Sequence, residues 1–199
     1  MSAEILVLDR NWSPHRWIDV EEAILLESKD LVVDHKGSII TVYHGGKNRI
    51  TGLQSTIETS SIIVIDGLPN PRKFKEPSLT NGSLFQRDRH VCANCTRVYR
   101  TLDLTRDHIH PTSKGGKDIW MNVITACRSC NSLKGDTLPG HKLPNGEHGP
   151  FGPIMTIAYL PYVPCKSEHM LMRGRNIKAD QMEFLIGQIT NPNSRFYQH

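Results

Sequence analysis

The sequence predicts an α+β fold in which a small central domain is flanked by two less regular regions. Two observations support this fold class. Short β-rich runs and a capped helical stretch occur together in the N-terminal third of the 199-residue chain. Two Cys-x-x-Cys pairs stand in the middle of the chain, which predicts a zinc-bound core there. We therefore divide the chain into residues 1–76, 77–140 and 141–199.

The N-terminal region, residues 1–76, is predicted to be a small α/β extension. Asp19 followed by Glu22 is the pattern of a helix N-cap with its capping-box partner, so a helix is expected through about Ser28. Lys36-Gly37 separates two β-rich runs, which predicts a hairpin there. The runs that predict strands are residues 5–8, 31–33, 39–43 and 61–65.

The two connecting segments differ from these elements in composition. Residues 67–77 are rich in proline and basic residues, so an extended, solvated linker is expected. Residues 138–153 carry four prolines and four glycines, which predicts an irregular loop. In the C-terminal region the apolar spacing over residues 178–189 predicts one short amphipathic helix.

Charge and hydropathy narrow the class of protein. No apolar run approaches the roughly 18 residues of a membrane helix. The N-terminus lacks a basic stretch followed by an apolar core, so we expect no signal peptide, no membrane partner and a cytoplasmic location (the host cytoplasm for a phage-encoded protein). Residues 86–142 hold ten Lys and Arg against five Asp and no Glu, a local charge of +5. This basic segment suits a polyanionic partner, although a merely solvated basic face is the alternative.

The cysteine pattern favours a metal over disulfides. Cys92 and Cys95 form one pair and Cys127 and Cys130 a second, while Cys165 stands alone and is expected to be a small buried residue rather than a ligand. Four thiolates make the ligand set of a closed, tetrahedral structural zinc site. The 31 residues between the pairs exceed the usual zinc-ribbon interval, so the insert must hold structure of its own. A redox pair, or thiols left unpaired by chance, is the alternative.

The insert contains the sequence Asp107-His108-Ile109-His110-Pro111, a downstream Asn122, and then Cys127-Arg-Ser-Cys130-Asn131-Ser-Leu-Lys134-Gly. Leu102, Leu104 and Arg106 alternate, which predicts a strand that delivers Asp107 and His108 to its end. This combination resembles the zinc-bearing subgroup of the HNH endonuclease family, over about Phe85 to Pro139. Residues 7–14, with Trp17 and Ala23, also resemble an extension that often precedes this nuclease unit.

The resemblance implies a ββα-metal core, in which a β-hairpin, a loop and a helix grip one divalent cation. It implies that Asp107 and Asn131 ligate this cation, that His108 is the general base and that Asn122 braces the loop. The family often has His where Asn131 stands, and an Asp–Asn pair of oxygen ligands suits Mg²⁺ or Mn²⁺. A loop carbonyl is expected to hold the Nδ1–H of His108. His110 is the alternative base, and Asn122 could instead be a surface turn residue.

The implied activity is hydrolysis of DNA phosphodiester bonds, by nicking or cutting, to a 5′-phosphate and a 3′-hydroxyl. Imidazole can accept a proton from water near neutral pH, and a divalent cation can stabilise the leaving oxygen. Double-stranded DNA is the expected partner, and a double-strand break would need a homodimer or two encounters. RNA and branched DNA stay open as substrates. The residues expected to contact phosphates are Arg106, His110, Lys114, Arg128 and Lys134.

Two other readings compete with an endonuclease. A non-catalytic, zinc-stabilised nucleic-acid-binding module would keep the basic segment and make Asp107, His108 and Asn131 incidental. A structural or regulatory zinc protein would use the flanking regions instead. Salt-sensitive binding with unaltered DNA ends would favour the binding module over the enzyme.

Overall fold

In the computed structural model of the chain, residues 4–67, 74–138 and 157–197 are described. The chain forms two compact units. Unit 1 consists of residues 1–75 and 166–189, and unit 2 of residues 76–165 and 190–199. The region expected as residues 141–199 is therefore shared between both units. Among the described residues, no helix is both long and apolar enough to cross a membrane.

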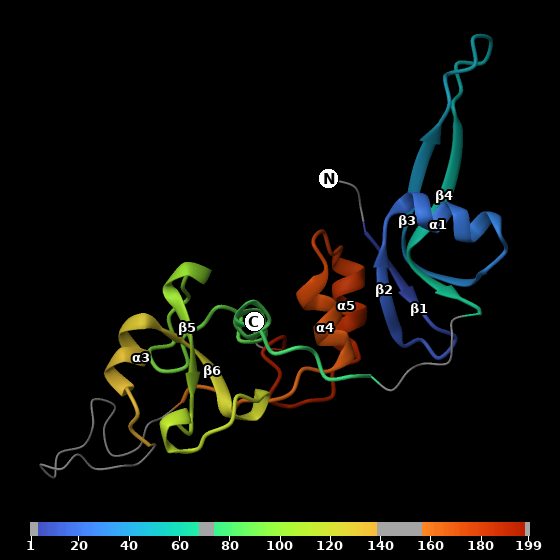
Figure 1. The fold of residues 1–199 in the computed structure, drawn as a ribbon. Helices are drawn as coiled ribbons and strands as arrows, with labels where there is room; N and C mark the ends of the chain where they lie inside the picture. The colour runs from blue at the N-terminus through green and yellow to red at the C-terminus, as the bar shows by residue number, and fades with distance from the viewer. Residues whose placement is uncertain (1–3, 68–73, 139–156, 198–199) are drawn as a thin grey trace, which may run out of the picture. The chain divides into compact units, whose positions relative to one another are not determined.

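Unit 1 contains a four-stranded sheet with the strand order β2-β1-β4-β3 (Figure 1). β1 (Ile5–Leu8) pairs antiparallel with β2 (Pro14–Ile18) and parallel with β4 (Ser55–Ile65). β3 (Val32–His44) pairs antiparallel with β4. The sequence analysis predicted β1 and the end of β4 correctly, but it did not anticipate β2.

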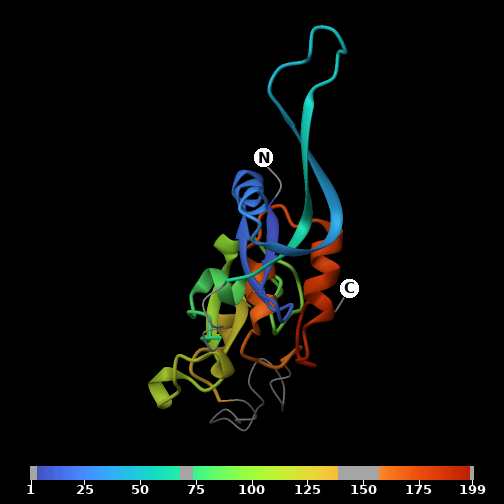
Figure 2. The same cartoon turned by 90° about the vertical axis from the view of Figure 1, so that its right-hand side faces the viewer.

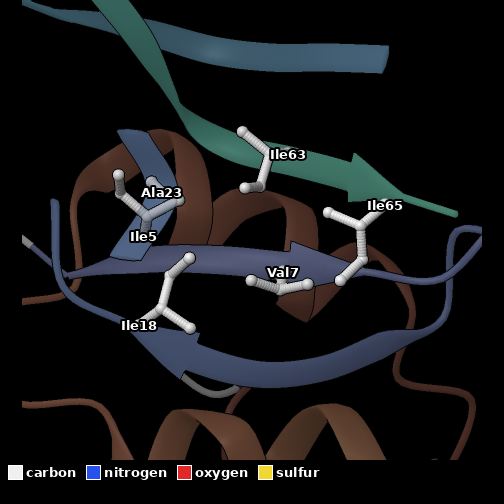
Figure 3. Close-up of a cluster of buried hydrophobic side chains, with 6 residues drawn as sticks. All are labelled: Ile5, Val7, Ile18, Ala23, Ile63 and Ile65. Carbon is white, nitrogen blue, oxygen red and sulfur yellow. The ribbon is translucent and has the colours of Figure 1, made fainter. Parts of the chain in front are cut away.

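One face of this sheet packs against α1 (Val20–Ser28). Strand side chains alternate between the two faces, so Ile5 and Val7 lie on one face with Ile63 and Ile65 from β4. Figure 3 shows this cluster together with Ile18 and Ala23. Each fully buried aliphatic side chain contributes roughly 1.5–3 kcal/mol through its removal from water. The cluster fixes α1 on the sheet.

The start of α1 confirms the predicted cap, because the Asp19 carboxylate accepts a hydrogen bond from the backbone N–H of Glu22 at 2.8 Å. The Glu22 side chain does not complete a capping box. Its carboxylate forms an ion pair with Arg16, at 2.6 Å.

The hairpin predicted at Lys36-Gly37 is wrong. β3 runs through this point as one strand, and its pairing with β4 shifts register between Lys36 and Ile39. Gly37 has φ +81°, and a side chain there would collide with Ser61 Oγ. A bulge in a long strand and a tight turn both need such a glycine, so the local sequence did not distinguish them. The turn lies instead beyond His44, and Figure 2 shows how far the two paired strands extend.

Two C-terminal helices complete unit 1: α4 (Lys166–Arg173), which the sequence analysis missed, and α5 (Ala179–Gly187), which falls within the predicted 178–189. The buried amide of Gln181 donates to the carbonyls of Glu4 and Ser61, at 2.8 and 2.7 Å. The indole of Trp17 donates to the Met170 carbonyl at 3.0 Å. These bonds satisfy polar groups that the sheet would otherwise bury without partners.

Unit 2 is built on a two-stranded antiparallel sheet, β5 (Leu104–His108) and β6 (Val123–Cys127), followed directly by α3 (Arg128–Lys134). α2 (Asn81–Arg87) begins at Thr80, which forms a capping box with Ser83. The remaining elements in the described part of unit 2 are three short 3-10 helices: η1 (Thr101–Asp103), η2 (Thr112–Lys114) and η3 (Trp120–Asn122). The loop predicted over residues 138–153 lies almost entirely outside the described residues, as does much of the linker predicted over 67–77.

A buried ion pair stands at the centre of unit 2. Arg87 and Asp88 are both fully buried, and the Arg87 Nε lies 2.7 Å from Asp88 Oδ1. Arg87 also donates to the carbonyls of Trp120, Tyr162 and Val123, and Asp88 Oδ2 accepts from the N–H of Thr125. The pair therefore joins α2, β6 and the chain near Tyr162 through hydrogen bonds that few other side chains could replace.

Replacing Arg87 with methionine is expected to destabilise unit 2 by about 3–5 kcal/mol, because it leaves the Asp88 carboxylate buried without its counter-ion. Thermal unfolding followed by circular dichroism measures the change. Arg100→Met is the matched control, since the ion pair of Arg100 with Asp103 is exposed and its loss should hardly move the transition. Equal unfolding temperatures of the two variants would show that the buried ion pair is dispensable for stability.

Candidate metal centre and active-site pocket

The four predicted cysteines come together in unit 2. The sulfur atoms of Cys92, Cys95, Cys127 and Cys130 all lie within 4.8 Å of one another. Four thiolates around a tetrahedral zinc ion, with Zn–S bonds of about 2.3 Å, would stand about 3.8 Å apart. The cluster thus matches a structural zinc site, as the spacing predicted. Cys165, the fifth cysteine, is not part of this cluster.

Two local structures bring these sulfurs together. The first pair lies on a tight turn, where the N–H of Cys92 donates to the Arg97 carbonyl and Thr96 adopts a left-handed conformation (φ +60°). The second pair spans the junction between β6 and α3, because Cys127 is the N-cap of α3 and its sulfur accepts from the N–H of Cys130. The four-cysteine cluster therefore joins the turn at Cys92 to the junction between β6 and α3.

Asp107, near the end of β5, is almost entirely buried. Its Oδ1 accepts a hydrogen bond from Lys134 Nζ at 2.6 Å, and the same ammonium donates to the His108 carbonyl. Its Oδ2 is buried and has no hydrogen-bond partner among the described residues. Burial raises the pKa of Asp107 above its usual value, and the Lys134 ammonium offsets part of this shift. One carboxylate oxygen is therefore left for a further cationic partner.

Asn131, on α3, lines the same pocket as Asp107. Its Nδ2 donates to Thr105 Oγ1 at 2.9 Å and, at 3.4 Å, to the Arg106 carbonyl. Both nitrogen contacts orient the amide and leave its oxygen for another partner. Asp107, His108 and Asn131 line one pocket of about 240 Å³. The two expected cation ligands, Asp107 and Asn131, and the expected base, His108, therefore line one cavity.

The imidazole of His108 forms a hydrogen bond with a carboxylate that the sequence analysis did not identify. His108 Nε2 lies 2.9 Å from Asp118 Oδ1, and Arg106 holds the other oxygen of the same carboxylate. The hydrogen bond from Arg106 lowers the pKa of Asp118, so this side chain is ionised near neutral pH. The predicted loop carbonyl is not the partner of the ring in the described part of the chain.

Asn122 spans the loop between β5 and β6. Its side-chain oxygen accepts from the N–H of His110, and its amide nitrogen donates to the carbonyls of His110 and Lys117. Gly116 fits inside this loop because a Cβ there would lie 1.8 Å from the His110 carbonyl oxygen. The loop is therefore held by the hydrogen bonds of the Asn122 side chain, and its tight path requires a glycine at position 116.

The residues expected to contact phosphates differ in whether they line the pocket. Arg106 lines the pocket, whereas the guanidinium of Arg128 is bonded to the Leu102 carbonyl and Lys114 to the Asp136 carbonyl. Lys134 is 2% exposed, and its ammonium is bound to Asp107 and His108. Its burial argues against the expected phosphate contact and gives it a structural role instead. His110 is exposed and does not line the pocket.

Sequence reasoning missed Asp118 because it lies ten residues beyond His108, in a loop without periodicity. Its only local signal is that it is one of just five acidic residues in the basic segment. Lys134 was misread because a lysine near a helix end is usually solvated. Only the fold shows that it points inward.

Comparison with known proteins agrees with this geometry. No curated protein matched the chain. A family model described as HNH endonuclease matches residues 92–143. The matched segment, about a quarter of the chain, contains both cysteine pairs and the pocket residues Asp107, His108 and Asn131. The resemblance drawn from the sequence is therefore confirmed for this segment: residues 92–143 are similar to the HNH endonuclease family, a family of nucleases.

Proposed function

We propose that the protein is a metal-dependent DNA endonuclease, which hydrolyses phosphodiester bonds at the pocket of unit 2. The observation that carries this proposal is the convergence of a buried carboxylate, an amide and an imidazole on one cavity. The nuclease family of the matched segment supports the same reaction class. One such pocket per chain would cut one strand at a time, so two chains would be needed for a concerted double-strand break.

The residues present fit a hard divalent cation. The unpartnered Oδ2 of Asp107 and the amide oxygen of Asn131 are both oxygen donors, as Mg²⁺ and Mn²⁺ prefer. When bound, the cation would stabilise negative charge on the scissile phosphate and its leaving oxygen. The ammonium of Lys134 holds Oδ1 and so keeps the carboxylate in one orientation.

His108 is proposed as the general base. Asp118 accepts the Nε2–H of the imidazole, which leaves the Nδ1 lone pair to take a proton from the attacking water. The ionised Asp118 would also stabilise the imidazolium that results. Arg106 positions Asp118 and neutralises it, so that the pocket does not repel a phosphate. The products would be a 5′-phosphate and a 3′-hydroxyl.

The cysteine cluster alone would fit a non-catalytic zinc module equally well. Such a module has no need for an imidazole paired with an ionised carboxylate beside a buried carboxylate with a free oxygen. A buried carboxylate is costly to fold, and its place beside the imidazole supports catalysis over binding alone.

The test is nicking of supercoiled, linear and branched DNA with Mg²⁺, Mn²⁺, Ca²⁺ or no added metal. We expect cleavage with Mg²⁺ or Mn²⁺ and its loss in Asn131→Ala at unchanged zinc content. Asn193→Ala is the control, since Asn193 lies away from the pocket. Binding of DNA without cleavage under any metal would identify the protein as a binding module.

Asp118→Asn is expected to lower the cleavage rate about 10–100-fold, because the amide keeps the size of the side chain but loses its charge. The substitution should act on the rate of the chemical step and leave DNA affinity nearly unchanged. Single-turnover cleavage separates these two quantities. Asp103→Asn, which removes an exposed carboxylate outside the pocket, is the control. A rate equal to that of the unsubstituted protein would remove Asp118 from the mechanism.

A further inference from the structure

The β3–β4 hairpin of unit 1 continues well beyond the rest of its sheet. Six residue pairs, from Ile39↔Ser60 to His44↔Ser55, join the two strands past the point where β1 pairs with β4. Figures 1 and 2 both show the outer part of this hairpin projecting away from α1 and the other strands, whereas at its base Ile40 packs on the core and Thr59 is buried. We call residues 39–60 the arm. At about 3.3 Å per residue, its four outer pairs, Thr41↔Glu58 to His44↔Ser55, span about 13 Å.

The charge on the arm has one sign over most of its length. From residue 35 to residue 57 the chain contains Lys36, Lys47 and Arg49 and no Asp or Glu. Lys47 and Arg49 stand together in the tip, residues 45–54, and both are exposed. Lys36 lies at the base, where its ammonium stands over the ring of Trp12. Glu58, on β4, is the only carboxylate of the arm. The tip is therefore a basic surface.

Apolar side chains accompany these charges although no packing in unit 1 accounts for them. Ile50 is 95% exposed, and Leu53 and Tyr43 are 73% and 67% exposed. Single exposed apolar residues are ordinary, but with Ile39, which is 66% exposed, four lie on this narrow hairpin. Such residues contribute free energy only when a partner covers them.

The backbone of the tip is fixed before any partner binds. Asn48 Oδ1 accepts from the N–H groups of Ile50 and Thr51, at 2.8 and 3.1 Å. The N–H of Asn48 donates to the Leu53 carbonyl at 2.7 Å, and Gln54 Nε2 donates to the Gly45 carbonyl. An ordered tip loses less conformational entropy on binding than a loose loop would.

We propose that the arm enters a groove of duplex DNA, with Lys47 and Arg49 on phosphates and Ile50 against the bases. This inference rests on the proposed function, which makes DNA the substrate. The major groove of B-DNA is about 12 Å wide and about 8.5 Å deep, and it admits a two-stranded β-ribbon. The paired portion is long enough to reach its floor. Basic side chains would set the position on the backbone, and an apolar one would contact base edges or a base step.

The test measures DNA affinity separately from cleavage. All variants are made in the His108→Ala background, so that the DNA stays intact, and each binds a fluorescently labelled duplex of mixed sequence at several salt concentrations. Lys47→Ala/Arg49→Ala is expected to bind about tenfold more weakly at physiological salt. Its slope of log affinity against log salt should be smaller by about 2, one for each lost phosphate contact.

Ile50→Ala should also weaken binding but leave the salt slope unchanged, because it removes no charge. Leu25→Ala on α1 and Lys29→Ala at the C-cap of α1 are matched controls outside the arm and should bind as the background protein does. All of these side chains are exposed, so the variants should fold normally. Thermal unfolding checks this.

Three results would overturn the inference: arm variants that bind like the α1 controls, tighter binding to duplex RNA of the same sequence, or a dimer that dissociates on Ile50→Ala while DNA affinity stays the same. The deep, narrow major groove of A-form RNA would not admit the arm.

Plasmid nicking by variants that retain His108 separates the two proposals. Cleavage with arm-independent binding refutes only the arm. Arm-dependent binding without any cleavage refutes only the endonuclease.

Discussion

Replacing Cys92 with serine is expected to unfold the core of unit 2. The sulfur cluster joins the turn at Cys92 to the junction of β6 and α3. Zinc binding to small four-ligand domains is worth about 10–16 kcal/mol near neutral pH, and most of it is free energy of folding. Loss of one thiolate should therefore release the metal and the fold together. Circular dichroism and measurement of bound zinc test this.

Cys165→Ser is the matched control, because this cysteine lies outside the cluster. We expect it to keep its zinc and to melt like the unsubstituted protein. Strong chelation of the unsubstituted protein should reproduce the effect of Cys92→Ser. A zinc-free Cys92→Ser protein with an unchanged melting transition would show that the cluster is not structural.

Replacing His108 with alanine is expected to lower DNA cleavage about 10²–10⁴-fold, the usual contribution of a positioned general base. The imidazole is partly exposed and its ring contacts Asp118, so its loss should leave the melting temperature nearly unchanged. Zinc content should also be unchanged. Single-turnover nicking with Mg²⁺ or Mn²⁺ measures the rate.

The matched control is His110→Ala, which removes the other histidine of the same motif. His110 lies outside the pocket and makes its hydrogen bonds to Asn122 through the backbone, so its side chain should matter little. Loss of cleavage in His110→Ala with full activity in His108→Ala would exchange the roles of the two residues.

The sequence predicted those parts of the site whose chemistry depends on local spacing. Two Cys-x-x-Cys pairs can hold one ion because each pair needs only a tight turn, and the structure gathers all four sulfurs. The alternation over residues 102–106 predicted a strand that carries Asp107 and His108 to its end, and β5 ends at His108. The predicted cap at Asp19 was correct for the same reason, since it depends on a backbone N–H three residues away.

What could not be predicted depends on contacts between distant residues. Asp118 reaches His108 only because the loop closed by Asn122 folds back on β5. The bulge at Gly37 resembled a turn because both need the same backbone conformation. No local pattern indicated that α4 and α5 belong with the N-terminal strands, since the hydrogen bonds of Gln181 span more than 100 residues.

The division of unit 1 into two stretches of chain affects how the protein is made. β4 ends at Ile65 and α4 begins at Lys166, so about 100 residues are translated between the sheet and the helices that satisfy its buried carbonyls. At about 5–20 residues per second, the nascent sheet waits for about 5–20 seconds. During that interval it exposes unpaired polar groups and apolar surface to the crowded space around the ribosome. Chaperone dependence of soluble yield should therefore be governed by unit 1 rather than by the zinc-bound domain.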